Sequence, residues 1–441
     1  MSKYIKLYSN EAVFASDLQA GMQLPNMSLV DATGKTYCIP EKSWGLTIPV
    51  DGSTNYTLVG NEAACNSYLS KIGRYLLKSN GDAYKLNEYD STILDYNDAT
   101  FAPNLGNVMV RIPRLSYMVV RDSAGRDTIW MTEEPVMRNV IEEQWIGAYL
   151  ASYYGNKLRS MKGETVAANR TINTFWDQAQ ANGKAFGLTN YTQRILMVLI
   201  YLSKYRSLNS QATLGYGMNG NTDNFAAAQN KPTGETSSIG DACGSVDGGT
   251  DNANAKHISL FGLEDIYGWF WEMIQGVFLI NNKVYVYDGN RMPDSEELAY
   301  GAKGKSRSFN RIASEGWITK LVGGEHFDIF PSAVGGGSSS YWCDYTYTST
   351  NGQLLLWGGD AHDGANCGLV YSNSNNAWTN AWTNIGSRHT IQGNARRLYV
   401  LSDTPEPCIR ILPHSGCHEQ KVSDGKTTCP ICFSQECKKC C

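Results

Sequence analysis

Over the first 130 residues, apolar and polar positions alternate in short runs, a pattern that predicts strands joined by tight turns. Turn-forming sequences at 31–34 and 51–52 separate the apolar runs at 29–30, 36–39 and 46–50. The run 108–112 is the strongest strand candidate, and 121–126 is typical of a hairpin turn leading into a strand at 128–130. The N-terminal part is therefore predicted to be rich in β-structure.

After Pro135 the apolar residues take the spacing of a helix face. The first such set consists of Ile141, Trp145, Ala148 and Ala151. It predicts a helix over 141–151, and the same spacing predicts a second helix over 172–179, ended by Gly183, and a third, stronger one over 191–205. We assign these apolar faces to core packing rather than to ligand binding.

From 209 to 400 the chain is rich in Gly, Asn and Ser, with only brief apolar runs at 269–271, 277–280, 284–287 and 354–357. A region of this length with so little periodicity predicts a few short strands that carry long, ordered loops. Together with the helices this indicates an α+β fold. The Pro-containing stretch 404–407 then marks a boundary to a cysteine-rich tail.

Composition narrows the function classes. At about 150 residues per domain, 441 residues suggest about three domains. The net charge is −4 and no basic stripe appears, so we expect no nucleic-acid partner. No apolar run approaches the roughly 18 residues of a membrane span. The first eight residues lack the apolar core of a secretory signal, which predicts synthesis in a cytoplasm and either retention there or export without a signal peptide.

Several motifs, in their order along the chain, resemble one fold family. They lie at 145–154, 208–212, 262–272, 357–360, 373–378 and 384–388. This order resembles the C-type lectin fold of formylglycine-generating enzymes and of variable proteins of diversity-generating retroelements, over about residues 85–400. The resemblance implies a β-rich attachment module over 1–84, a C-type-lectin-like ligand-binding domain over 85–402 and a Cys-rich tail over 403–441.

The enzyme branch of this family implies a copper ion held by two cysteines five residues apart. Cys367 stands at the second of these places, but His362 occupies the first. One thiol and one imidazole are a conceivable copper pair, although a small buried Cys367 is the simpler interpretation. Trp269 and Met273 also replace the Asn and the second Trp of the enzyme pattern. We therefore predict no catalysis and no cofactor in the lectin-like domain, and keep a copper oxidase as an alternative.

The variable-protein branch fits the segment 366–384, in which six of nineteen residues are Asn. In that family a reverse transcriptase copies a template with errors at adenines, and Asn codons are rich in adenine. The resemblance implies a variable region at about 340–390. Aromatic rings with small polar side chains also make a good recognition surface on physical grounds. The predicted ligand-binding residues are Trp357, Asp360, His362, Asp363, Asn366, Tyr371, Asn373, Asn375, Asn376, Trp378, Asn380, Trp382 and Asn384.

An alternative remains open for two of these residues. Trp357 and Trp378 are equally well explained as structural tryptophans beneath a polar, Gly-rich loop. For the Asn residues, an exposed position that faces a ligand is the favoured interpretation, and plain solvation is the other.

The function implied by the resemblance is that of an adhesin or receptor-binding protein with a surface diversified by a retroelement. Segments 72–82 and 108–113 resemble sequences ahead of such lectin domains in tail-fibre proteins of gut phages. The N-terminal module would then attach the protein to a virion tail fibre or a cell surface, with a homotrimer as one arrangement. The expected ligand is a bacterial surface protein or glycan.

The tail has its own chemistry, because seven of the twelve cysteines fall in the last 34 residues. His414, Cys417, Cys429 and Cys432 form two pairs with two-residue gaps, a spacing that suits one tetrahedral zinc ion. A second site would use Cys408, Cys437, Cys440 and Cys441. The alternative is a reduced, disordered or cross-linked tail. A third function class is therefore a zinc-tailed protein-interaction module.

Overall fold

The protein is described by a computed structural model. It describes residues 4–7, 12–14, 27–31, 33–220, 225–287, 291–293, 295, 298–299, 301, 307–391 and 409–410. Strands dominate and helices are few, so the predicted mixed α+β class is confirmed. Among these residues no helix is both long and apolar enough to cross a bilayer.

Two antiparallel sheets are formed mainly by the first 141 residues. The smaller has the strand order β2 (Ala12–Phe14), β1 (Tyr4–Leu7), β3 (Met27–Val30), β4 (Thr36–Ile39). The larger has the order β12 (Asn139–Ile141), β10 (Leu115–Arg121), β11 (Asp127–Thr132), β5 (Trp44–Thr47), β6 (Leu58–Gly60). The hairpin predicted at 121–126 joins β10 to β11, with the Asp122 carboxylate accepting from the N–H groups of Ala124 and Arg126.

A seven-stranded sheet connects distant parts of the chain. Its order is β16 (Phe186–Leu188), β29 (His389–Ile391), β13 (Gln144–Gly147), β9 (Gly106–Ile112), β7 (Gly73–Lys78), β8 (Asp82–Lys85), β30 (Ile409–Arg410). Strand β9 confirms the strand predicted at 108–112. Since β8 spans the proposed boundary at residue 84 and β7 pairs with β9, the division between the first two domains stays a prediction.

The largest sheet has nine strands and carries the Asn-rich segment. Its path is β22 (Arg307–Asn310), β21 (Lys283–Val286), β20 (Trp271–Ile280), β26 (Leu354–Trp357), β27 (Ser372–Asn376), β25 (Tyr345–Thr348), β23 (Gly316–Gly323), β24 (Asp328–Val334), with β28 (Ile385–Gly386) beside β20. Smaller sheets are β14 (Ser152–Tyr154) with β15 (Lys157–Arg159), and β17 (Gly244–Asp247), β18 (Lys256–Leu260) and β19 (Leu263–Glu264).

The helices are short except for one. They are α1 (Glu62–Leu69), α2 (Ile172–Gln180), α3 (Tyr191–Tyr205), α4 (Ser210–Leu214) and α5 (Phe225–Ala228), with 3-10 turns at Pro103–Leu105, Gly217–Asn219, Glu235–Ile239, Gly324–His326 and Gly364–Asn366. The predicted helices at 172–179 and 191–205 are confirmed as α2 and α3. Asn190 caps α3, and its side chain and that of Gln193 bond each other's backbone N–H groups.

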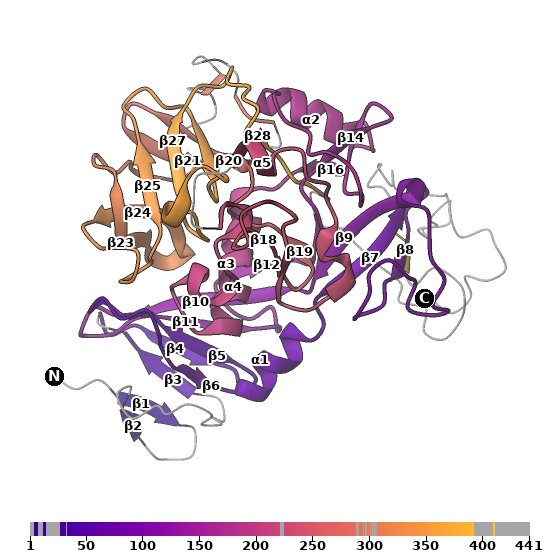
Figure 1. Cartoon of the computed structure of the whole chain (residues 1–441). Coiled ribbons are helices and arrows are strands. Elements are labelled where there is room, and N and C mark those ends of the chain that lie inside the picture. Colours follow the sequence, from indigo (N-terminus) through magenta and orange to yellow (C-terminus); the bar gives the residue numbers. More distant parts are fainter. Residues whose placement is uncertain are drawn as a thin grey trace, which may run out of the picture.

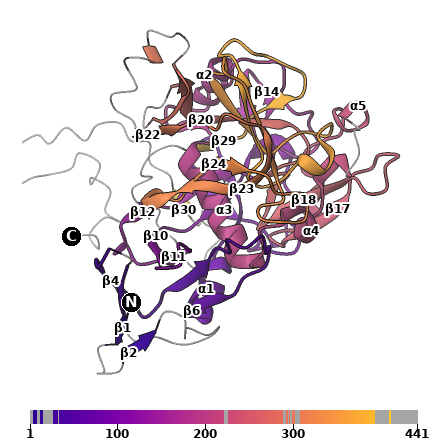
Figure 2. The same cartoon turned by 90° about the vertical axis from the view of Figure 1, so that its left-hand side faces the viewer.

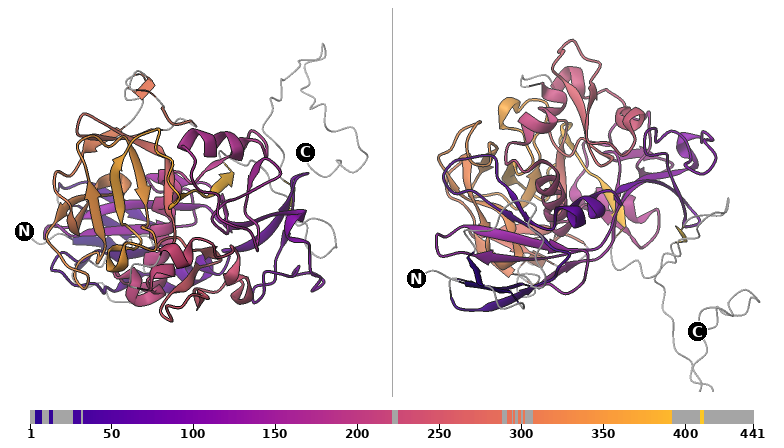
Figure 3. Two further views of the ribbon diagram at one scale, coloured as in Figure 1. Left: turned by 45° about the horizontal axis from the view of Figure 1, so that its top comes forward. Right: turned by 90° about the horizontal axis from the view of Figure 1, so that it is seen from below.

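Helix α3 occupies the centre of the molecule, and its buried side chains join the main core with residues of β5, β9, β10, β20 and β26. Figure 1 shows the strands of the nine-stranded sheet above this helix and β10 and β11 below it, and Figure 2 shows the same order after a quarter turn. Figure 3 places the orange strands of the nine-stranded sheet and the hairpin β7–β8 on different sides of the molecule.

The helix predicted over 141–151 is wrong. The segment instead forms the end of β12 and strand β13, which pairs with β9 and β29. The intervening residues Ile146, Tyr149 and Leu150 are as deeply buried as the four that suggested a helical face. A segment buried on both faces is typical of a central strand, and picking every third or fourth apolar residue from it mimics helical spacing.

Candidate functional site

The segment that follows β26 is turned by two glycines. Gly358 and Gly359 have φ of 93° and 80°, in the left-handed region that glycine adopts without steric cost. A Cβ on Gly359 would lie 2.6 Å from Cys367 Sγ. This close packing folds residues 360–371 back onto the strand, where the Gly358 N–H donates to the Tyr371 carbonyl.

A pair of carboxylates organises the turn after the glycines. The Asp360 N–H donates to Asp363 Oδ2 at 2.8 Å, and the His362 N–H donates to Asp360 Oδ1 at 2.8 Å. The Tyr371 hydroxyl donates to Asp363 Oδ1, and Asn384 Nδ2 donates to Asp360 Oδ2 at 2.5 Å. Burial, with the nearby Asp360 charge, raises the pKa of Asp363 to about 7.

The Asn side chains on and after β27 are bonded to one another. Asn376 Nδ2 donates to Asn375 Oδ1 at 2.8 Å and to Asn373 Oδ1 at 3.3 Å, and Asn380 Nδ2 donates to Asn376 Oδ1 at 2.8 Å. Asn375 is exposed, while Asn373 and Asn380 are half-buried and Asn376 is buried. The group presents amides on a strand rather than on an unsupported loop.

Three of the four predicted aromatic anchors lie below this surface. Trp357, Tyr371 and Trp378 are 0%, 3% and 6% exposed. The Trp357 indole N–H donates to the Leu369 carbonyl, and the Tyr371 ring packs against Trp271. The interpretation left open for Trp357 and Trp378, structural tryptophans beneath a polar loop, agrees with this burial. Trp382 differs, because it is 59% exposed.

The remaining predicted ligand-binding residues also differ in how far they are buried. Asp360 is buried, and Asp363, Asn366 and Asn384 are half-buried. His362 is exposed, and its ring stacks on Phe225 of α5 with centroids 5.0 Å apart. The residues that reach solvent are thus His362, Asn375 and Trp382, with the half-buried amides between them. No bound ligand tests the set, so its role in binding stays a prediction.

Cys367 is placed as a structural residue. It is fully buried, and its Sγ donates to the Asp360 carbonyl at 3.1 Å. The main-chain carbonyl of Cys367 accepts from Gln211 Nε2. Burial raises the pKa of the thiol well above its usual value. Since copper binds the thiolate, this environment disfavours the copper-ligand alternative and agrees with the simpler interpretation of a small buried cysteine.

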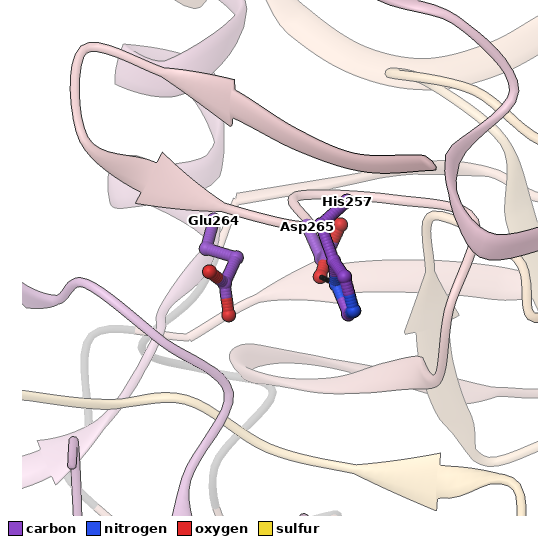
Figure 4. Close-up of side chains that lie close together, drawn as sticks. All are labelled: His257, Glu264 and Asp265. Carbon is purple, nitrogen blue, oxygen red and sulfur yellow. Dashed lines mark hydrogen bonds and ion pairs between the residues drawn. The ribbon is translucent and has the colours of Figure 1, made fainter. Parts of the chain in front are cut away.

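Sequence reasoning assigned no role to a buried group beside the motif at 262–272. His257, Glu264 and Asp265 point to the same side of the β18–β19 hairpin (Figure 4). His257 Nδ1 lies 2.6 Å from Asp265 Oδ2, and the Ile258 N–H donates to Asp265 Oδ1. Burial lowers the pKa of His257, but the Asp265 carboxylate outweighs burial and raises it to about 9.

The Glu264 carboxylate is also fully engaged by the chain. It accepts from the N–H groups of Gly234 and Thr236 and from the Thr236 hydroxyl, at 2.7–2.8 Å. The three side chains have the chemistry of metal ligands, but the carboxylate oxygens of Glu264 and Asp265 accept hydrogen bonds that hold the hairpin and the preceding turn. The visible signal in the sequence was the Glu–Asp pair two residues after Gly262.

Arg388 binds this hairpin to the seven-stranded sheet. Its guanidinium donates to four main-chain carbonyls, those of Gly147, Ala148, Glu264 and Asp265, at 2.5–3.3 Å. Its Nε lies 3.6 Å from Glu272 Oε2, and both side chains are buried. These contacts join residues more than 100 positions apart. Together with His257, Glu264 and Asp265, Arg388 and Glu272 form what we term the buried ion cluster.

The predicted zinc ligands His414, Cys417, Cys429 and Cys432 lie outside the described residues, as do the cysteines proposed for a second site. The zinc site stays a prediction. Of the five cysteines before the tail, Cys65, Cys343 and Cys367 are buried and Cys243 is half-buried, and all four are free thiols.

No protein-family model matches the sequence, and no curated protein matches it. Among solved structures, the chain is similar to the Major Tropism Determinant U1 variant, at 14% identity and a TM-score of 0.29 over 85% of this chain and 83% of that chain. The M1 variant gives 13% identity and 0.28 over 89% and 85%, and the P3c variant 12% and 0.27 over 85% and 83%.

All three structures are variants of one Major Tropism Determinant. TM-scores of this size carry no argument for a shared fold or activity. The functional proposal therefore depends on the residues and contacts described above.

Proposed function

We propose that the protein is a receptor-binding protein or adhesin whose ligand-binding surface is the segment 357–384. The observation that carries this proposal is the layering of that segment. Exposed and half-buried polar side chains lie on a strand of the nine-stranded sheet, above a buried aromatic layer that includes Trp357, Tyr371 and Trp378. A buried aromatic layer of this kind is expected to keep the backbone in place when the side chains above it are substituted.

The proposed ligand is a surface protein or glycan of a bacterium. The exposed Trp382 supplies apolar area with few rotatable bonds, while Asn375 and its neighbours supply amide donors and acceptors. Amides pair with hydroxyls and with peptide groups, so this chemistry suits both ligand classes. Attachment to a virion tail fibre or cell surface through the N-terminal module, and a homotrimer, extend the proposal.

Diversification is tested at the DNA level. Sequencing a few kilobases around the gene is expected to find a reverse-transcriptase gene and a non-coding near-copy of codons 340–390 that differs only at adenines. Finding neither would leave a fixed lectin-like binder. The adenines of the near-copy would also name the variable residues, and we expect them to include the codons of Asn375 and Asn380.

Binding is tested with the full chain and intact cells of a panel of bacterial strains. On a strain that binds the wild type, Trp382→Ala and Asn375→Ala are expected to reduce binding at least tenfold. Lys283→Gln, at the exposed first residue of β21, serves as the control. Binding that survives both substitutions would place the ligand elsewhere.

Deleting 408–441 tests the zinc-tail alternative, which predicts lost partner binding with intact folding.

A further inference from the structure

A cavity of about 260 Å³ lies away from the proposed receptor-binding surface. It is formed by the β7–β8 turn, strand β15 and the segment between α2 and β16, and Figure 1 shows β7 and β8 on the side of the molecule opposite β23–β25. We call it the basic cavity, because Lys78, Lys157, Arg159 and Lys184 line it. None of its fourteen lining residues is Asp or Glu.

The positive charge of this cavity is not neutralised by the part of the chain that the structure describes. Arg159 donates to neutral oxygens only, Asn107 Oδ1 at 2.9 Å and the Gly106 and Asn104 carbonyls. Neither Lys157 nor Lys184 forms an ion pair with a described residue. In a chain with a net charge of −4, four cations around one small cavity without a carboxylate are a marked excess.

Of the neighbouring groups, His389 adds no charge, and one carboxylate, that of Asp82, lies beside the lining residues Asn80 and Gly81. Behind the cavity, the ring of buried His389 lies beside Phe186 with centroids 5.9 Å apart. Burial, together with the charges of Arg159 and Arg388, lowers the pKa of His389 to about 3, so the imidazole stays neutral. The nearest carboxylate along the chain, Asp82, is buried and accepts a hydrogen bond from Asn80.

The cavity also offers an apolar wall. Leu77, Ala185, Phe186 and Ile391 line it, and most of its exposed lining is apolar. Its volume is below the ~300–1,000 Å³ of pockets that hold drug-sized ligands, so the occupant is small. The Lys78 ammonium lies 4.4 Å from the centroid of the Tyr84 ring, which leaves Lys157 and Lys184 beside Arg159. A fixed guanidinium with ammonium groups near it is a good receptor for carboxylate and phosphate oxygens.

We propose that the basic cavity binds a small organic anion, a carboxylate or phosphate group carried on a partly apolar scaffold such as a sugar ring. Arg159, held by Asn107 and Gly106, would orient the anionic group, while Lys157 and Lys184 would approach it from the rim. The Phe186 ring would cover an apolar face of the scaffold. This site does not depend on the proposed receptor-binding role of 357–384.

The test uses the full chain and four probes in calorimetric titrations: D-glucuronate, D-glucose 6-phosphate, D-glucose and inorganic phosphate. At least one charged sugar is expected to bind ten times more tightly than glucose and than inorganic phosphate, and which one does identifies the anionic group. Equal affinity for charged and neutral sugars, or no binding by any probe, would overturn the proposal. Inorganic phosphate binding as tightly as the sugars would overturn the role of the scaffold.

Matched charge variants locate the site. Lys157→Gln/Lys184→Gln changes two side chains at the rim and is expected to weaken binding of the charged sugar at least tenfold. Lys283→Gln, an exposed lysine elsewhere, is expected to leave it unchanged. Binding should also weaken as salt rises, because the contacts are ionic. An unchanged affinity in the double variant, with thermal unfolding as in the wild type, would place the anion outside this cavity.

Discussion

Two polar regions of this protein differ in the groups to which their side chains form hydrogen bonds. In the segment 373–380 the Asn side chains bond mainly to one another, whereas in the buried ion cluster Arg388 and Glu264 bond to main-chain atoms. Each of the bonds between Asn side chains joins the buried Asn376 to an exposed or half-buried Asn, which can exchange its side of the bond for water. A buried carbonyl that loses its donor cannot be compensated in this way. We therefore expect substitutions to be tolerated in the segment 373–380 and to destabilise the fold in the buried ion cluster.

The largest expected effect comes from Arg388→Met. This change removes one of the two buried guanidinium groups that interact with the Glu272 carboxylate, the other being Arg194, and it removes the donor to four carbonyls. Loss of one partner of a buried ion pair costs about 3–5 kcal/mol. Denaturant unfolding is the measurement, and Arg126→Met is the control, since its ion pair with Asp122 is exposed and worth at most about 1 kcal/mol. Equal effects of the two changes would mean that burial does not raise the cost of losing an ion-pair partner in this protein.

The pH dependence of stability tests how much His257 contributes to the buried ion cluster. The pKa of His257 is about 9 in the folded state, above the ordinary 6.5 of the unfolded chain, because the Asp265 carboxylate outweighs burial. Its contribution is therefore fully present below pH 6.5 and is lost as pH rises through 9. It amounts to up to about 3 kcal/mol, at 1.36 kcal/mol per pKa unit.

The measurement is the free energy of unfolding between pH 6 and 10, for the wild type and for His257→Gln. The wild type is expected to lose stability across this range, whereas the variant, which cannot titrate at this position, should be less stable at pH 6 and show a flatter profile. Parallel profiles would mean that the pKa of His257 is the same in the folded and unfolded protein.

The turn at 360–371 should respond to pH locally. Burial and the Asp360 charge raise the pKa of Asp363 to about 7, so its folded pKa lies above the unfolded one and its protonated form favours the fold. Its contribution is therefore fully present below the ordinary pKa of 3.8 and is lost as pH rises through 7, so between pH 6 and 8 the turn loses the last part of it, about 1 kcal/mol.

Amide hydrogen exchange of residues 360–371 between pH 6 and 8 measures this change once intrinsic rates are subtracted. Protection is expected to fall in the wild type and to stay constant in Asp363→Asn, whose side chain carries no charge. Asp122→Asn, in the β10–β11 hairpin, is the control. The same loss of protection in Asp363→Asn would assign the effect to another group.

The sequence predicts a long element with regular apolar spacing better than a short strand that is buried on both faces. Helix α3 was predicted because its apolar spacing is regular over fifteen residues. Strand β13 was missed because apolar residues occupy both of its faces. In the candidate site, the pattern located the polar segment and left a structural role open for Trp378, but it could not decide that Trp378 is buried. Arg388 could not be assigned a partner, because its contacts lie 123–241 residues away in the sequence.

The smallest expected effect tests whether the Asn surface tolerates change. Asn375 is exposed, and its side chain accepts one hydrogen bond, from Asn376. Asn375→Ala should therefore alter stability by less than about 0.5 kcal/mol, as is usual for surface positions. The matched control is Asn107→Ala, because Asn107 is 5% exposed and its Oδ1 accepts from Arg159 Nε and the Ser160 N–H.

Removing the Asn107 amide leaves both donors unpaired inside the protein, at a cost of about 1–3 kcal/mol. Scanning calorimetry on the two variants is expected to show an unchanged Tm for Asn375→Ala and a lowered Tm for Asn107→Ala. A lowered Tm in both variants would mean that the surface amides stabilise the strand, and that substitutions at these positions destabilise the fold. Only an unchanged Tm at Asn375 fits a surface on which new side chains can appear without unfolding the sheet beneath it.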